Sequence, residues 1–201
     1  METLNINNQK PHAENICTRL KNTFLELLEK DPIEKISVTK LCKIVQINRS
    51  TFYQYYCDIY AVLEDIQKDF LQQIDQLSEY IIKLELNPEE VIQTIQKYIY
   101  EHKNVLYLLM IQYEYPEFER EIHEKILRLF RIKVLQSYEL PSNVTPEELE
   151  NTLLFLTAGF YTVYKRWIQE NHSDDEKIVP TQIAGMSQMC LDYLLKDSSR
   201  R

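Results

Sequence analysis

The residues from Asn48 to Tyr56 carry the side chains whose types and spacing best define a chemistry. The run is Asn-Arg-Ser-Thr-Phe-Tyr-Gln-Tyr-Tyr. Arg49 can donate two hydrogen bonds to guanine and Gln54 can pair with adenine, each good pair supplying roughly 1–3 kcal/mol of discrimination. Phe52 and Tyr56 are four residues apart, which places them on one face of a helix. The pattern predicts a short helix with Asn48 as N-cap that faces DNA on one side and packs on the other.

Two further helices are expected to position this one. A short helix is predicted over residues 37–45, with Ser37 as N-cap and apolar residues on one face. A first helix is predicted over residues 14–30, because its apolar residues repeat at helical spacing and Asp31-Pro32 follows. A tight connection at residues 46–48 completes a helix-turn-helix.

Residues 18–63 resemble the N-terminal domain of the TetR/AcrR family of transcriptional regulators. That family carries a pattern close to Gly-Val-Ser-x-x-x-Phe/Leu-Tyr-x-Tyr/His-Phe, then a capping residue and Lys. Here residues 46–59 read Gln-Ile-Asn-Arg-Ser-Thr-Phe-Tyr-Gln-Tyr-Tyr-Cys-Asp-Ile. Gln46 stands where the family usually has Gly, so the turn must tolerate a strained residue or take another shape. Ile59 stands where the family usually has a phosphate-contacting Lys.

The resemblance implies two groups of DNA contacts. One group enters the major groove towards base edges or phosphates, and we expect it to comprise Arg49, Ser50, Gln54 and Tyr55, with Asn48 as a further DNA-binding residue at the start of the helix. The other group, by analogy with the family, contacts backbone phosphates and fixes register without reading sequence. Its expected members are Ser37, Thr39, Lys43, Thr51 and Tyr53.

Charge is distributed unevenly along the chain. The net charge of −8 would ordinarily argue against a nucleic-acid-binding protein. Residues 1–57, however, hold eight Lys or Arg against six Asp or Glu, whereas the remainder holds 15 against 25. A DNA-facing head on an acidic body fits this polarity.

Composition favours an all-α fold. The chain has only two glycines, Gly159 and Gly185, which argues against sheet-rich folds and Gly-rich phosphate loops. No apolar run reaches 18 residues and the polar start lacks a signal-peptide core, so we expect a soluble, cytoplasmic protein without a membrane partner. The four cysteines form no C-x-x-C pair, so neither a zinc site nor a disulfide framework is indicated. No cofactor is expected.

The remainder of the chain is predicted to be helical throughout. Asp58 can cap a long helix that extends to about Ile81, and Asn87-Pro88 and Thr145-Pro146 are strong helix starts. Further helices are expected over residues 91–101, 105–111, 116–136 and 145–170, and from about 180. We therefore predict a three-helix DNA-binding domain of residues 1–57 and a ligand-binding and dimerisation domain of residues 58–201.

The helix over residues 145–170 has two apolar faces, so it must be buried on both sides. In the family, the last two helices pair with those of a second subunit as a four-helix bundle. The resemblance thus implies a homodimer, with Leu154, Gly159, Tyr161, Tyr164, Ile168, Met186, Met189 and Tyr193 at its interface. The alternative is a central core helix of a monomer.

The body is rich in aromatic residues. By resemblance it would enclose a pocket for a small effector, apolar or aromatic, lined by Tyr98, Tyr107, Tyr113, Phe130, Phe155, Tyr161 and Trp167. The alternative is that these aromatics form ordinary core.

The sequence thus predicts a transcriptional regulator, by family habit a repressor, that binds a pseudo-palindromic operator on double-stranded DNA as a dimer and is released by the effector. One alternative is an adaptor or co-regulator whose head, with Gln46 and Ile59, has lost independent DNA binding. An enzyme is the weaker alternative. No Glu-x-x-His pair of the di-iron type occurs, and Glu119 and His123 fit a surface ion pair better than a metal site, so no catalytic or metal residue is assigned.

Overall fold

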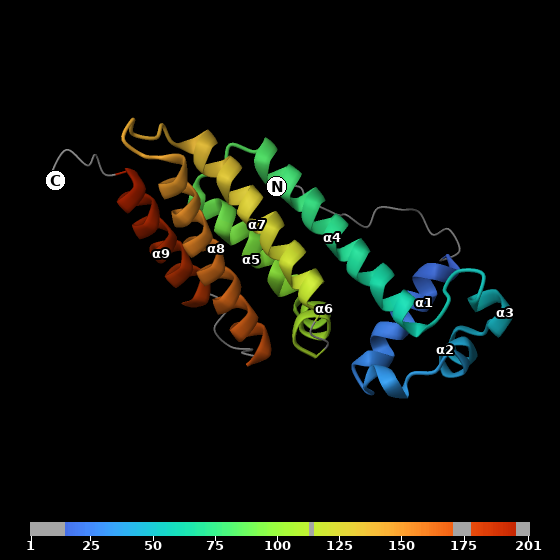
Figure 1. Ribbon diagram of the computed structural model, residues 1–201. Coiled ribbons are helices and arrows are strands. Elements are labelled where there is room, and N and C mark those ends of the chain that lie inside the picture. Colours follow the sequence, from blue (N-terminus) through green and yellow to red (C-terminus); the bar gives the residue numbers. More distant parts are fainter. Residues whose placement is uncertain (1–14, 113–114, 171–177, 196–201) are drawn as a thin grey trace. The chain divides into compact units, whose positions relative to one another are not determined.

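The computed structural model describes residues 15–112, 115–170 and 178–195, and all regular structure in these ranges is helical (Figure 1). This agrees with the predicted all-α fold. The chain divides into two compact units, one ending at Lys68 and the other beginning at Asp69. We call the first unit the head and the second the body.

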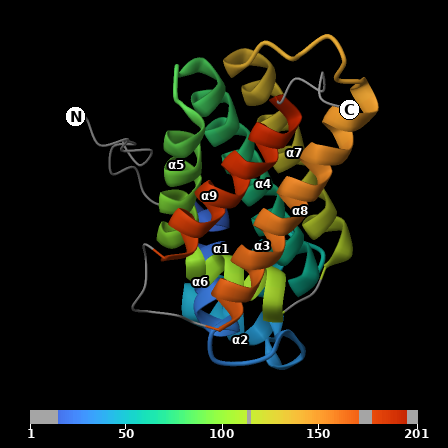
Figure 2. The ribbon, with the colours of Figure 1, turned by 90° about the vertical axis from the view of Figure 1, so that its left-hand side faces the viewer.

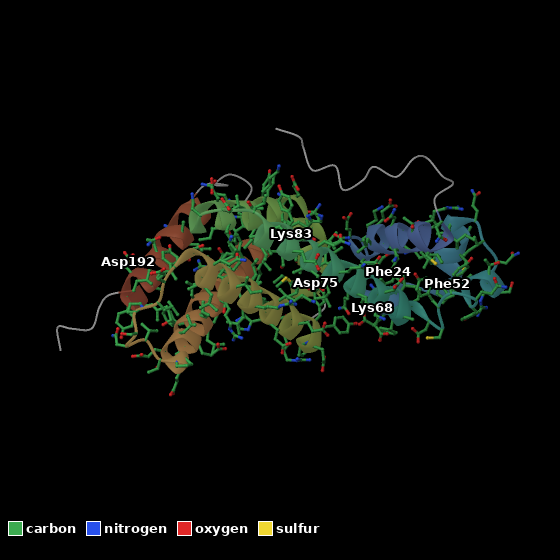
Figure 3. All side chains as sticks on the ribbon, turned by 90° about the horizontal axis from the view of Figure 1, so that it is seen from above. Phe24, Phe52, Lys68, Asp75, Lys83 and Asp192 are labelled. Atoms are coloured by element: carbon green, nitrogen blue, oxygen red, sulfur yellow. The ribbon has the colours of Figure 1, made fainter. Side chains whose placement is uncertain are left out.

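The head is built from α1 (Ile16–Leu28), α2 (Val38–Val45), α3 (Arg49–Phe52) and the first part of α4 (Ile59–Lys83). A short 3-10 turn, η1 (Ile33–Lys35), joins α1 to α2. The helices enclose an apolar core in which Phe24 and Phe52 have no exposed surface (Figure 3). Burying aromatic side chains of this size contributes several kcal/mol in all, about 1.5–3 kcal/mol for each large apolar side chain.

Side-chain caps begin two of the head helices where the sequence predicted them, whereas Asn48 stands at the N-cap of α3 without a side-chain cap hydrogen bond. The Ser37 hydroxyl accepts a hydrogen bond from the Lys40 amide at 3.1 Å, and Asp58 accepts one from the Ala61 amide at 2.8 Å. Each cap satisfies an amide that the helix itself leaves without an acceptor.

The turn between α2 and α3 contains the residue that departs from the family pattern. Gln46 has φ 59° and ψ 46°, the left-handed conformation in which glycine is favoured. It is the one described non-glycine residue with positive φ. The Arg19 guanidinium donates to the carbonyl of Val45 at the end of α2, which ties this turn to α1. The turn therefore keeps the helix-turn-helix geometry and carries the strain.

The body contains the rest of α4, then α5 (Pro88–Glu101), α6 (Lys103–Tyr107), the π-helix η2 (Leu108–Gln112), α7 (Pro116–Ser137), α8 (Pro146–Gln169) and α9 (Ile178–Leu195). Both α5 and α8 begin with a reciprocal capping box, Asn87 with Glu90 and Thr145 with Glu148. Helix α8 packs between α7 and α9, as Figure 1 shows, and Figure 2 shows α8 and α9 side by side from another direction.

Ion pairs join the body helices across their half-buried faces. Lys125 on α7 meets Asp75 on α4 at 2.7 Å, and Lys165 on α8 meets Glu119 on α7 at 2.8 Å. Because all four side chains retain some solvent, each pair is worth at most about 1 kcal/mol. Their main effect is to set the register of α7 against its two neighbours.

Candidate DNA-binding surface and effector cavity

The predicted DNA-contacting side chains all come from residues 37–55 of the head, and we call this set the surface strip. Nine of them are exposed and Thr51 is half-buried, whereas Phe52 and Tyr56 are buried beneath them. Helix α3 is only four residues long, and residues 53–55 continue it as a turn. The strip therefore presents polar groups from α2, α3 and this turn, and the aromatic residues Phe52 and Tyr56 are buried beneath them.

Arg49 and Tyr53 form a pair on this strip. The Arg49 guanidinium donates to the Tyr53 hydroxyl at 3.3 Å and lies 5.8 Å from the centre of its ring. An arginine held over an aromatic ring loses less conformational freedom when it binds a phosphate or a base. The pair thus pre-orders the side chain that we expect to read guanine.

Tyr56 connects the end of the turn at residues 53–55 to α1 and α4. Its hydroxyl donates to Asp65 at 2.7 Å, and Lys21 reaches the same carboxylate at 3.1 Å. Burial, together with the bond to Asp65, raises the pKa of Tyr56. Burial alone would raise the pKa of Asp65, but the bonds from Tyr56 and Lys21 outweigh it and hold that pKa below its usual value.

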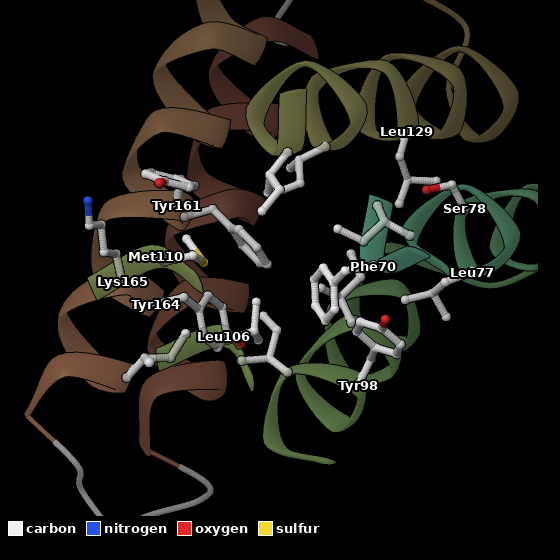
Figure 4. Close-up of a pocket in the computed structure, with 17 residues that line it drawn as sticks. Phe70, Leu77, Ser78, Tyr98, Leu106, Met110, Leu129, Tyr161, Tyr164 and Lys165 are labelled. Carbon is white, nitrogen blue, oxygen red and sulfur yellow. The ribbon is translucent and has the colours of Figure 1, made fainter. Parts of the chain in front are cut away.

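The body contains a partly open cavity of about 70 Å³ (Figure 4). Its wall is drawn from α4, α5, α6, η2, α7 and α8, and it is almost entirely apolar. Phe70, Ile74 and Leu77 come from α4, and Met110 comes from the π-helix. A dry apolar cavity of this kind accepts apolar molecules and leaves water out.

Most polar groups on the cavity wall are already paired. The Tyr161 hydroxyl donates to Glu119 at 2.6 Å, Lys165 donates to both oxygens of Glu119, and the Tyr98 hydroxyl donates to Gln73 at 3.2 Å. Burial raises the pKa of Tyr98, and burial with the Glu119 bond raises that of Tyr161. Tyr164 differs, because its buried hydroxyl has no hydrogen-bond partner.

Comparison with known proteins gives the family. A family model of the TetR type, described as a transcriptional regulator C-terminal region, matches residues 86–189, more than half of the chain. This chain belongs to the TetR family of transcriptional regulators. The uncharacterised HTH-type regulator YxbF of Bacillus subtilis is 18% identical over 175 residues, which are 85% of this chain and 44% of YxbF. The chain thus spans less than half the length of that relative.

Solved structures of TetR-type regulators share the fold. The dihydroxyacetone kinase operon activator DhaS aligns with a TM-score of 0.68 at 14% identity, over 90% of this chain and 98% of DhaS. A TetR/AcrR regulator from Aquifex aeolicus gives 0.66 at 15% identity, over 87% and 99%. FadR of Bacillus subtilis, in complex with stearoyl-CoA, gives 0.60 at 15% identity, over 89% and 97%.

The predicted effector residues of this TetR-family chain separate into several environments. Tyr98 and Tyr161 line the cavity, whereas Phe130 borders a smaller space of about 30 Å³. Phe155 is 75% exposed, Tyr107 is exposed, and Trp167 is buried with its ring 6.5 Å from that of Tyr100. Tyr113 lies outside the described residues. The sequence prediction missed the aliphatic wall, because residues such as Ile95 and Ile126 follow the same helical spacing as ordinary core.

The predicted interface residues of α8 and α9 also divide. Leu154, Gly159, Met186, Met189 and Tyr193 are exposed, and Tyr161 is half-buried. Tyr164 and Ile168 are buried within the same chain and line the cavity, because that face of α8 turns inward. Phe155 lies on the exposed side instead. A Cβ added at Gly159 or Gly185 would meet nothing within 4 Å, so neither glycine is required by packing inside the chain.

Glu119 and His123 have separate partners. Glu119 bonds Lys165 and Tyr161, while His123 Nε2 lies 3.3 Å from the Thr157 hydroxyl. The ion pair on this part of α7 joins Arg120 to Glu124 at 2.7 Å. Among the described residues, no three His, Cys, Asp or Glu side chains gather closely enough to hold a metal ion.

None of the described helices has both the length and the apolar character of a membrane span.

Proposed function

We propose that this TetR-family regulator binds a pseudo-palindromic DNA operator as a homodimer, by way of the surface strip of its head. The observation that carries this proposal is the division within residues 48–56, where polar side chains are exposed and Phe52 and Tyr56 are buried. An adaptor without DNA binding would have no need of such a set. In the proposed complex, α3 and its following turn enter the major groove, with Arg49 and Gln54 directed to base edges.

The proposed DNA-binding domain is residues 1–57, and residues 58–201 form the regulatory and dimerisation domain. The left-handed conformation of Gln46 supports retention of the helix-turn-helix without glycine. Two such domains related by a two-fold axis would read half-sites about one helical turn of DNA apart. As Ile59 is buried, the phosphate contact expected from the family's Lys is assigned instead to residues of the strip, such as Lys43.

The proposed dimer interface is the exposed apolar face of α8 and α9. Phe155, Met186, Met189 and Tyr193 are each more than half exposed, and Leu154, next to Phe155 in sequence, is also exposed. Contiguous exposed apolar groups of this kind mark protein contact surfaces. Gly159 on the same side leaves room for a partner helix to approach closely.

The proposed effector site is the cavity of the body. Its apolar wall favours an apolar or aromatic molecule, and the stearoyl-CoA held by FadR is a precedent for ligand binding in this fold. An effector that binds one dimer conformation better shifts the population towards it. DNA would be released if, in that conformation, the distance between the two heads no longer matched the distance between the operator half-sites. The ligand would then relieve repression.

Selection from a random duplex library tests the DNA-binding proposal. Purified protein is mixed with the library at moderate and at low salt, and the bound duplexes are sequenced. Enrichment of a two-fold symmetric motif is the expected result. Absence of enrichment at both salt concentrations would overturn the proposal and favour the adaptor.

Sedimentation analysis tests the dimer independently of DNA. We expect a dimer for the native chain and a monomer for Met189→Glu, because a charge at the centre of the apolar face must be desolvated on association. A matched Gln188→Glu variant places the charge one residue away and should remain dimeric. A native chain that sediments as a monomer at micromolar concentration would exclude this interface.

A further inference from the structure

Tyr164 places an unpaired polar atom at the cavity of the body. Its side chain is 4% exposed, and its hydroxyl oxygen is buried without any hydrogen-bond partner. Figure 4 shows the side chain extending from α8 into the space that Phe70 faces from the other side. A buried hydroxyl without a partner is uncommon, because the lost hydration is not replaced.

Three neighbouring polar side chains are hydrogen-bonded to other groups and so are not partners of the Tyr164 hydroxyl. Tyr161 and Lys165 both bond Glu119, and Tyr98 bonds Gln73. The positive charge of Lys165 is therefore already balanced. Among the described residues of the wall, Tyr164 is the one whose buried hydroxyl has an unused hydrogen-bonding site.

The chemistry of that hydroxyl defines what it can bind. Burial raises the pKa of Tyr164, so the phenol keeps its proton at neutral pH and can act as a donor. A donor requires an acceptor on the ligand, such as a carbonyl or ether oxygen. A ligand charge would be costly in this wall, because Lys165 is neutralised by Glu119 and the other contacts are mostly apolar.

The side of the cavity formed by the π-helix has features that would let it move when a ligand binds. The space of about 70 Å³ is smaller than the roughly 300–1,000 Å³ usual for ligand pockets. Met110 contributes an unbranched, adaptable side chain to the wall, and it comes from the π-helix Leu108–Gln112. Single turns of π-helix are frequent at functional sites, where their wider backbone is stabilised by surrounding contacts. Movement of this wall would enlarge the cavity and uncover the Tyr164 hydroxyl.

We propose that the effector is a small, neutral, mostly apolar molecule with one hydrogen-bond acceptor, and that this acceptor takes its hydrogen bond from Tyr164. The inference rests on the proposed function of the cavity as the effector site. It adds the class of ligand and the residue that selects it. A charged group on the ligand is disfavoured by the same argument, because Lys165, the cation of the described wall, is already paired with Glu119.

Two probes of nearly equal shape test the proposal. Acetophenone carries a carbonyl oxygen where α-methylstyrene carries a methylene group. Dissociation constants for both are measured by titration on the native chain, Tyr164→Phe and Tyr161→Phe. Comparing one probe between proteins cancels its own cost of leaving water, so the difference reports the hydrogen bond.

We expect Tyr164→Phe to weaken acetophenone binding about three- to tenfold and to leave α-methylstyrene unchanged or slightly tighter. Tyr161→Phe, the control on the same wall, should not change the preference between the probes, because its hydroxyl is committed to Glu119. Equal affinity of acetophenone for the native chain and Tyr164→Phe would overturn the inference and leave the effector site standing. Failure of both probes to bind any of the three proteins would overturn the effector site itself, and the inference with it.

Discussion

The head and the body place their proposed sites in opposite ways. The strip of the head lies on the surface, and its members come from residues 37–55, a short stretch of chain. The cavity lies inside the body, and its wall combines six helical segments between Phe70 and Ile168. A site made by neighbouring residues is defined by local helix geometry, whereas a site made by distant residues depends on how whole helices turn towards one another.

The two sites also differ in where their polar groups find partners. In the head, the buried hydroxyl of Tyr56 is bonded to Asp65, and the strained turn at Gln46 is tied to α1 by Arg19. In the body, the buried hydroxyl of Tyr164 is left unbonded beside open space. The buried polar groups of the head named here are therefore paired within the chain, whereas the body leaves the Tyr164 hydroxyl without a partner.

The largest effect is expected when the two residues proposed to read bases are replaced. Arg49→Ala combined with Gln54→Ala should weaken specific binding to the selected operator by roughly 2–6 kcal/mol, since each bidentate contact supplies about 1–3 kcal/mol. Helicity and the dimer should be unchanged, because both side chains are exposed. Binding is followed by fluorescence anisotropy with labelled operator. Arg128→Ala with Gln72→Ala removes the same residue types from exposed positions outside the head and should have no effect. If the first pair binds the operator as tightly as the native chain, the strip has been assigned to the wrong residues.

The next prediction compares two hydroxyls of the cavity wall. Tyr164→Phe should raise the free energy of unfolding by up to about 1 kcal/mol, because an unpaired buried hydroxyl is removed. Tyr161→Phe should lower it by about 1–2 kcal/mol, because a bond to the Glu119 carboxylate is lost in a half-buried setting. Urea denaturation measures both. Equal destabilisation by the two variants would mean that the Tyr164 hydroxyl has a hydrogen-bond partner in solution. The buried hydroxyl of the body would then be paired, like that of Tyr56 in the head.

These differences explain how much of the molecule could be predicted. The caps at Ser37, Asn87 and Thr145 were predicted correctly, because each is a local pairing of a side chain with the amide three residues ahead. The buried positions of Phe52 and Tyr56 followed from helical spacing in the same way. All residues of the strip except the half-buried Thr51 are exposed, and their role in DNA binding stays a prediction.

The inner and outer faces of α8 could not be assigned from sequence. Two apolar faces indicate burial on both sides but not which side meets its own chain, so Tyr164 and Ile168 were expected at a dimer interface and lie at the cavity. Phe155 was expected inside and lies outside. Only the packing of α8 against α7 and α9 decides this orientation. For the same reason, the aliphatic residues of the cavity wall were indistinguishable from core.

A third variant, with a smaller expected effect, tests whether a second subunit packs against the outer face of α8. Gly159→Ala should favour the helix by about 1 kcal/mol in a single chain, because a Cβ meets nothing there. In the proposed dimer it should also weaken association, because the added methyl group holds the partner helix away. Sedimentation at several concentrations measures the dimer. Asn151→Ala, exposed on the same helix, reports the effect of helix propensity alone. A more stable Gly159→Ala chain with unchanged dimer affinity would show that no partner helix approaches this glycine.

The smallest expected effect relieves strain in the head. Gln46→Gly should stabilise the protein by up to about 1 kcal/mol, because glycine adopts the left-handed conformation without steric cost. Part of this gain is offset by the greater freedom of glycine in the unfolded chain. Gln72→Gly, within α4, should instead destabilise by about 1 kcal/mol. Urea denaturation compares the two, and a loss of stability in Gln46→Gly would mean that the turn relaxes to another conformation in solution.

Trp167 gives the body an optical label that the head lacks. It is the only tryptophan of the chain, it is buried in α8, and its ring lies 6.5 Å from that of Tyr100. Its emission therefore reports the unfolding of the body, while circular dichroism reports the helices of both units. Coincident transitions would indicate that head and body unfold as one cooperative system, and separated transitions would indicate two. A single heating experiment followed by both signals can thus reveal whether the head depends on the body for its stability.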